Sequence, residues 1–120
     1  MEIGKRQAGD TLILSLSGDL DGRIAPETQR EILEALPPGG QVLLDLGGLG
    51  LVTSAGLRTM LQIYRRAQIV DTNVTLVGLS TQLRNILTAT GFLSFFTVDE
   101  SVEQCLVRLG EPVGQRGGAE

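Results

Sequence analysis

An apolar run that leads into a helical pattern is the feature that most limits the fold. Residues 41–46 are almost continuously apolar, as expected of a strand buried on both faces. We interpret the glycine-bearing stretch that follows, up to Val52, as a turn. From about Ser54 to Ile69, apolar residues then recur at the spacing of one helix face: Leu57, Met60, Leu61, Tyr64 and Ala67.

The rest of the chain alternates between strand and helix patterns. Short strands are predicted over 2–8, 11–18, 73–79 and 94–98, and a Gly9-Asp10 turn joins the first two as a hairpin. Three further helices are predicted: from Ala25 to a stop at Pro37-Pro38-Gly39-Gly40, from a Ser80 cap to Gly91, and from an Asp99 or Ser101 cap through Leu109. This order predicts an α/β fold, with a mixed sheet of four to five strands and about four helices.

Length and composition indicate one ordinary domain and exclude several functions. The chain has 120 residues, 42% of them hydrophobic, which predicts a single domain over 1–110 and a flexible tail over 111–120. A net charge of -4 argues against nucleic-acid binding. With no histidine and one cysteine, a Cys/His metal site and histidine-based catalysis are excluded, so we expect no enzyme activity, no metal and no cofactor. Without a signal peptide or an apolar membrane span, a cytoplasmic protein is expected.

The start of the second predicted helix is the candidate functional element. A helix N-terminus carries unpaired N–H groups and the positive end of the helix dipole, so it can hold an anion or a phosphorylated side chain. Thr53 and Ser54 lie there, and we expect Thr53 to cap the helix while Ser54 points outward. The loop at 18–22 also follows a strand, so the two segments are expected to share one surface.

Three short motifs, in this order, resemble the STAS domain of small bacterial anti-sigma-factor antagonists. They are Gly18-Asp19-Leu20-Asp21, Asp45-Leu46 and Thr53-Ser54-Ala55-Gly56-Leu57, and the resemblance covers roughly residues 5 to 109. It implies a STAS-like sheet that begins with a β-hairpin and a role in transcription regulation by partner switching.

The resemblance also implies which residues act. The family turn usually reads Asp-Ser-Ser-Gly-Leu, and its first serine, which corresponds to Ser54, is phosphorylated by a kinase that is also the anti-sigma factor. Thr53 and Ala55 replace the flanking aspartate and serine. The unphosphorylated form would bind the kinase, and a serine phosphatase would restore it; ATP and magnesium would belong to the kinase. The implied partner-binding residues are Asp19, Asp21, Thr53, Ser54, Gly56 and Arg58.

Alternatives remain open for several of these residues. Ser54 could be an ordinary capping hydroxyl, and Asp21 could satisfy loop amides instead of contacting a partner. Arg58 could pair with a phosphate on Ser54, one helical turn away, or belong to a solvated helix face. For the whole chain, the alternative is a STAS module that is not phosphorylated and serves as a scaffold subunit or small-ligand sensor in a larger complex.

Overall fold

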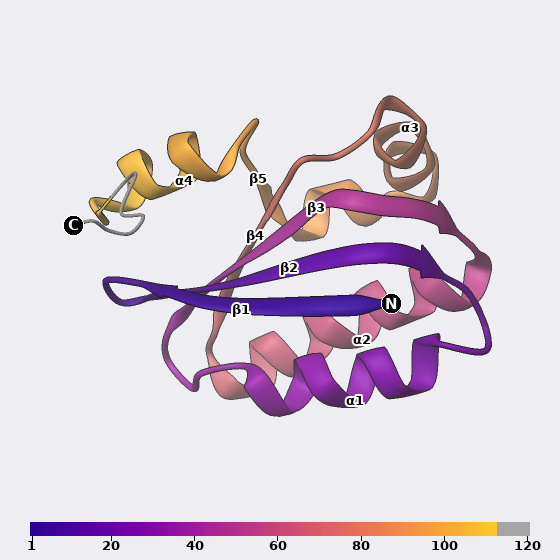
Figure 1. Ribbon diagram of the computed structural model, residues 1–120, viewed down its shortest axis with the longest axis horizontal. Coiled ribbons are helices and arrows are strands. Elements are labelled where there is room, and N and C mark those ends of the chain that lie inside the picture. The colour runs from indigo at the N-terminus through magenta and orange to yellow at the C-terminus, as the bar shows by residue number, and fades with distance from the viewer. Residues whose placement is uncertain (113–120) are drawn as a thin grey trace.

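The computed structural model describes residues 1–112 and contains one five-stranded sheet with the strand order β1-β2-β3-β4-β5. The strands span Glu2–Ala8 (β1), Thr11–Leu20 (β2), Gln41–Val52 (β3), Asn73–Val77 (β4) and Thr97–Val98 (β5). β1 pairs antiparallel with β2, and every other pair is parallel. The predicted hairpin and mixed α/β sheet are therefore confirmed (Figure 1).

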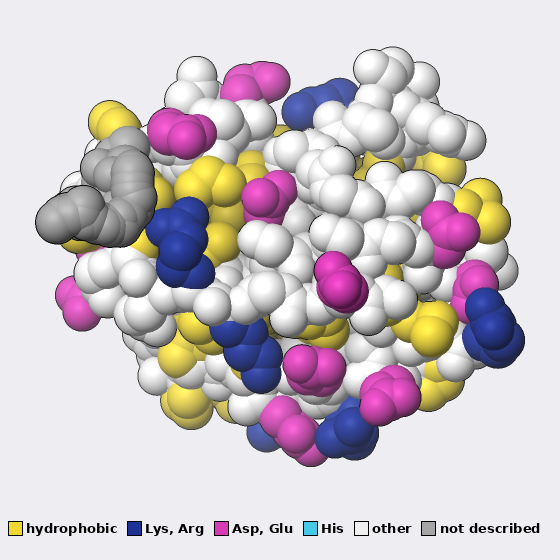
Figure 2. Space-filling model, viewed as in Figure 1, with side chains coloured by type: hydrophobic (Ala, Val, Ile, Leu, Met, Phe, Trp, Pro, Cys, Tyr) yellow, Lys and Arg dark blue, Asp and Glu magenta, His cyan; other side chains and the backbone are white. Residues whose placement is uncertain are grey.

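Helices cover the two faces of the sheet unequally. Helices α1 (Ala25–Ala35) and α2 (Ser54–Val70) lie side by side along one face, as Figure 1 shows, and α3 (Thr81–Thr90) lies toward the β4 side. The short helix α4 (Val102–Leu109) covers only part of the other face. Beyond α4 that face is mostly backbone and uncharged polar side chains over β2 and β3 (Figure 2).

Alternation along β3 divides its side chains between two hydrophobic clusters. Val42, Leu44 and Leu46 join the larger cluster beneath α1, α2 and α3. Leu43 points the other way, into a smaller cluster with Ala8, Ile13, Val77, Cys105 and Leu106. The prediction that residues 41–46 form a strand buried on both faces is confirmed.

Two predicted boundaries were wrong, because β2 and β3 continue as a pair beyond the expected turns. Residues 47–52 extend β3, and Asp19 and Leu20 extend β2, with register pairs Ser17↔Gly48, Gly18↔Leu49 and Leu20↔Val52. The glycines in this stretch serve close packing between strands: a Cβ on Gly48 would lie 2.6 Å from the Ser17 Oγ. A glycine-rich sequence is therefore not a turn here.

The predicted strand at 94–98 is also shorter than expected. Residues Phe92–Phe95 form a 3-10 helix (η1), and only Thr97 and Val98 pair with β4. The rings of Phe95 and Tyr64 stack with their centroids 4.6 Å apart, which holds the segment against α2 instead of in the sheet.

Side-chain hydrogen bonds mark where the last two helices begin. The Ser80 and Ser101 hydroxyls accept bonds from the backbone N–H groups of Leu83 and Gln104, so both cap their helices. Asp99, the other predicted cap, instead pairs with Arg108 at 2.9 Å.

The chain beyond α4 returns to the hairpin. The Glu111 carboxylate accepts hydrogen bonds from the Asp10 backbone N–H and the Thr11 hydroxyl, the latter at 2.9 Å. The flexible tail predicted over 111–120 stays a prediction, since residues 113–120 lie outside the described part of the chain.

Gly56 lets the first turn of α2 approach the sheet, which gives a first test of the packing. A Cβ there would lie 2.7 Å from the Leu20 carbonyl oxygen and 2.9 Å from a Val52 methyl group. We expect Gly56→Ala to lower the free energy of unfolding by about 1–3 kcal/mol, because backbone and core atoms must shift. The control is Gly4→Ala, whose Cβ has room at 3.8 Å from its nearest neighbour. Urea unfolding of both variants checks this, and equal stability would contradict it.

Cys105 gives the second test, through pH. Burial raises the pKa of its thiol, assisted by its interaction with Asp99. The folded state disfavours the ionised thiol. The contribution of Cys105 to the free energy of unfolding is therefore complete below the pKa of the unfolded state, about 8.5, and is lost as the pH rises above that value. Urea unfolding under reducing conditions should therefore show stability falling more steeply above about pH 8.5 in the wild type than in Cys105→Ala. Parallel pH curves for the two proteins would show that the pKa of the thiol is the same in the folded and unfolded states.

Candidate functional site

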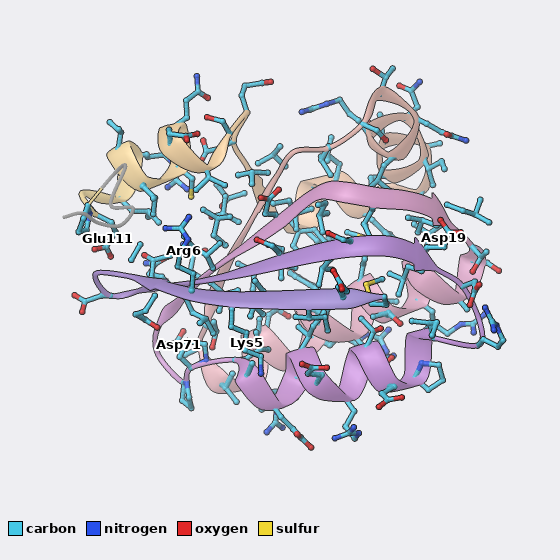
Figure 3. All side chains as sticks on the ribbon, in the orientation of Figure 1. Lys5, Arg6, Asp19, Asp71 and Glu111 are labelled. Carbon is cyan, nitrogen blue, oxygen red and sulfur yellow. The ribbon has the colours of Figure 1, made fainter. Side chains whose placement is uncertain are left out.

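The carboxyl ends of β2 and β3 meet beneath the N-terminus of α2, and there they form the candidate site. Figure 1 shows both strands leading to helices at the same end of the sheet, and Figure 3 shows Asp19 at that end. The loop after Asp21 reaches the first turn of α2, since a Cβ on Gly22 would lie 3.8 Å from the Ala55 Cβ. The two segments that the sequence predicted to share one surface do lie together.

Ser54 is the first residue of α2, and its side chain is exposed, as predicted. The first turn of α2 contains no acidic residue, and no side chain caps its N–H groups. The positive end of this helix is therefore open to a negative group placed there.

Thr53 occupies the N-cap position of α2, but its hydroxyl does not cap the helix as predicted. Its hydroxyl donates a hydrogen bond of 3.4 Å to the Leu20 carbonyl oxygen, and its backbone N–H donates to the same oxygen at 3.1 Å. Because Thr53 is extended and half-buried between the strand ends, its side chain is directed toward β2. Thr53 therefore ties the start of α2 to β2, and Ser54 is the more exposed hydroxyl.

Asp19, near the end of β2, and Asp21, in the loop that follows, both make intramolecular hydrogen bonds. An Asp21 carboxylate oxygen accepts from the backbone N–H groups of Arg23 and Ile24, at 3.0 and 3.2 Å, so it orders the turn into α1. Asp19 accepts from the Leu51 N–H at 2.8 Å and so links β2 to β3. The carboxylate fits because residue 50 is glycine: a Cβ there would be only 2.5 Å from the Asp19 oxygen.

Gly56 and Arg58 occupy different environments. Gly56 is buried against Leu20 and Val52, so its place in the site is to allow close packing. Arg58 is exposed and borders a surface depression of about 290 Å³ between the starts of α1 and α2. Gly22 and Ala55 line the same depression, which places Arg58 beside the Asp21 loop.

Sequence reasoning missed one exposed apolar residue at this end. Leu51, the next-to-last residue of β3, is 57% exposed. Its exposure follows from the extension of β3 past the sheet core, and recognising residues 47–52 as strand would have been needed to expect it.

Among residues 1–112, no group of three or more His, Cys, Asp or Glu side chains is placed to hold a metal ion. No helix in the same range is long and apolar enough to cross a membrane.

Comparison with known proteins agrees with this architecture. The STAS domain family matches residues 2–105. BtrV of Bordetella bronchiseptica, provisionally designated an anti-sigma factor antagonist, is 33% identical over 93 residues, which cover 77% of this chain and 80% of BtrV.

Solved structures share the fold at lower identity. The Thermotoga maritima protein TM1081, another provisionally designated antagonist, superposes with a TM-score of 0.81 at 14% identity, covering 90% of this chain and 94% of TM1081. The anti-sigma factor antagonist SpoIIAA in its unphosphorylated form gives 0.73 at 18% identity, with coverage of 91% and 96%. Bacillus SpoIIAA in its phosphorylated form gives 0.69 at 18% identity, with coverage of 90% and 99%. With the family matched over nearly the whole described chain, this protein belongs to the STAS domain family of anti-sigma factor antagonists.

Proposed function

We propose that this protein binds an anti-sigma factor that is also a serine kinase, and that phosphorylation of Ser54 by that kinase ends the binding. One observation carries the proposal: Ser54 is exposed on the uncapped N-terminus of α2, at the end of the sheet where the Asp21 loop contacts the same helix. SpoIIAA, which shares this fold, has been solved in phosphorylated and unphosphorylated forms.

The local chemistry suits a reversible modification. A phosphoryl group adds a charge of about -1.5 to -2 at neutral pH. The positive end of α2 and the Arg58 guanidinium, one turn along the helix, can balance that charge inside the protein. The domain is therefore expected to keep its fold when modified, while its surface charge changes where the partner binds.

Asp19 and Asp21 have a different part in this proposal. Their hydrogen bonds to Leu51, Arg23 and Ile24 hold the strand ends and the start of α1 in place. Because the carboxylates remain at the same end of the sheet as Ser54, a phosphoryl group there adds to existing negative charge. An acidic group of the partner would then be repelled.

The acceptor is tested by incubation with the kinase and ATP, followed by intact-mass measurement. Wild type and Thr53→Val should gain one phosphoryl group, because the Thr53 hydroxyl faces the Leu20 carbonyl. Ser54→Ala should gain none. Phosphate that persists in Ser54→Ala and disappears in Thr53→Val would move the acceptor to Thr53. If wild type gains no phosphate from a kinase that binds it, the non-phosphorylated module becomes the better interpretation.

A charge mimic tests how the switch works. Ser54→Asp should weaken binding to the kinase by tenfold or more, a loss of roughly 1.4 kcal/mol. Its free energy of unfolding should stay equal or rise by about 0.3–1 kcal/mol, because a negative charge is favourable at a helix N-terminus. Ser54→Asn is the uncharged control of the same size and should bind nearly as wild type. Calorimetric titration and urea unfolding measure the two effects; equal binding by the Asp and Asn variants would contradict a charge-based switch.

A further inference from the structure

The outward face of α2 carries exposed arginines without acidic neighbours on the same helix. Ser54–Val70 contains Arg58, Arg65 and Arg66 and no aspartate or glutamate, although the whole chain has a net charge of -4. All three arginines are exposed. α2 is thus a positively charged helix on a negatively charged protein.

Helical spacing aligns part of this charge with Ser54. At 100° per residue, positions 54, 58, 65 and 69 fall within about 60° of the helix circumference. We call Ser54, Arg58, Arg65 and Ile69 the α2 outer stripe. All four are exposed, and Ile69 is 75% exposed, so the stripe combines two charges with an apolar residue at its far end.

The arginines of the stripe have no ion-pair partner within residues 1–112. The ion pairs found there involve Lys5, Arg23, Arg30, Arg84 and Arg108. On the neighbouring helix α1, by contrast, Arg30 lies within 3.7 Å of both Glu27 and Glu34. Arg58 and Arg65 are therefore available to carboxylates of another molecule.

We propose that the α2 outer stripe is a docking surface for an acidic face of the anti-sigma factor; this rests on the function proposed above and extends its site from Ser54 along the helix to Ile69. Arg58 lies about 6 Å along the axis from Ser54, and Arg65 a further 10 Å or so, at a rise of 1.5 Å per residue. A partner with carboxylates at that spacing would gain attraction from both guanidinium groups and bury Ile69.

The stripe also gives phosphorylation a second effect. Its side chains carry two positive charges, and a phosphoryl group on Ser54 would add about -1.5 to -2. Arg58 is four residues from Ser54, the spacing at which helix side chains pair. The modified serine would therefore cancel most of the charge that attracts the partner.

A protein partner fits the charge pattern better than a nucleic acid or a lipid surface. α1 lies beside α2 and bears three glutamates, Glu27, Glu31 and Glu34. An extended anionic surface laid across this layer would meet those carboxylates as well as the arginines. Only a partner whose acidic groups are confined to the stripe avoids that repulsion.

The test compares two single charge reversals. Arg65→Glu changes the stripe, while Arg6→Glu makes the same charge change on β1, opposite Ile13 in the register and so on the α4 side of the sheet. Calorimetric titration with the purified anti-sigma factor should show Arg65→Glu binding tenfold or more weakly and Arg6→Glu nearly as wild type. Arg65→Lys, which keeps the charge, should retain most of the affinity. The difference in affinity between the two charge-reversal variants should shrink as the salt concentration rises from 50 to 500 mM, because salt screens exposed charges.

Other results would overturn the inference. If Arg65→Glu binds as tightly as Arg6→Glu, the stripe does not dock the partner. Binding of wild type to phosphatidylserine vesicles or to single-stranded DNA that is lost in Arg65→Glu would assign the stripe to another class of ligand. Both results differ from failure of the proposed function, in which wild type itself neither binds the kinase nor is phosphorylated on Ser54. Thermal unfolding checks that the exposed substitutions leave the fold intact.

Discussion

The Leu20 carbonyl oxygen lies where β2, β3 and α2 meet, and the geometry of the site depends on that junction. It accepts hydrogen bonds from both the backbone and the hydroxyl of Thr53. It also lies so close to Gly56 that any side chain there would collide with it. A backbone acceptor at the end of β2 thus helps to position the start of α2. Ser54, between Thr53 and Gly56, is the exposed residue of this junction.

Hydrogen bonds, as well as apolar packing, hold the carboxyl ends of β2 and β3 in place. Asp19 crosses from β2 to β3, and Asp21 bonds the turn into α1. These aspartates hold the strand ends in place and also contribute negative charge to the site. Among residues 1–112, every buried side-chain nitrogen and oxygen has a hydrogen-bond partner. In the proposed function, a surface held this way would change little in shape on phosphorylation, so the switch would act through charge.

Much of the fold follows from patterns in the sequence. The continuous apolar run at 41–46 and the helical spacing from Leu57 to Ala67 identify the central strand and helix, and serine caps mark where α3 and α4 begin. The exposed Ser54 and the neighbouring loop at Asp21 were also predictable, because strand ends meet at one edge of such a sheet. The family resemblance added the role of Ser54 as phosphate acceptor, which stays a prediction for this chain.

What the sequence did not reveal depends on contacts between distant residues. Gly48 and Gly50 resemble turn residues, yet they serve the approach of Ser17 and Asp19 from the adjacent strand. The Thr53 hydroxyl has two acceptable partners, its own helix and the Leu20 carbonyl, and only the position of β2 decides between them. Local propensity cannot distinguish these cases.

The two ends of the described chain lie at opposite ends of the sheet. A Cβ on Gly18 would lie 3.3 Å from the Met1 Cα, whereas Glu111 binds the hairpin far from Asp19 (Figure 3). A label or fused protein attached before Met1 would therefore lie near the carboxyl end of β2, while one inserted after Pro112 would lie near the β1–β2 hairpin, at the opposite end of the sheet.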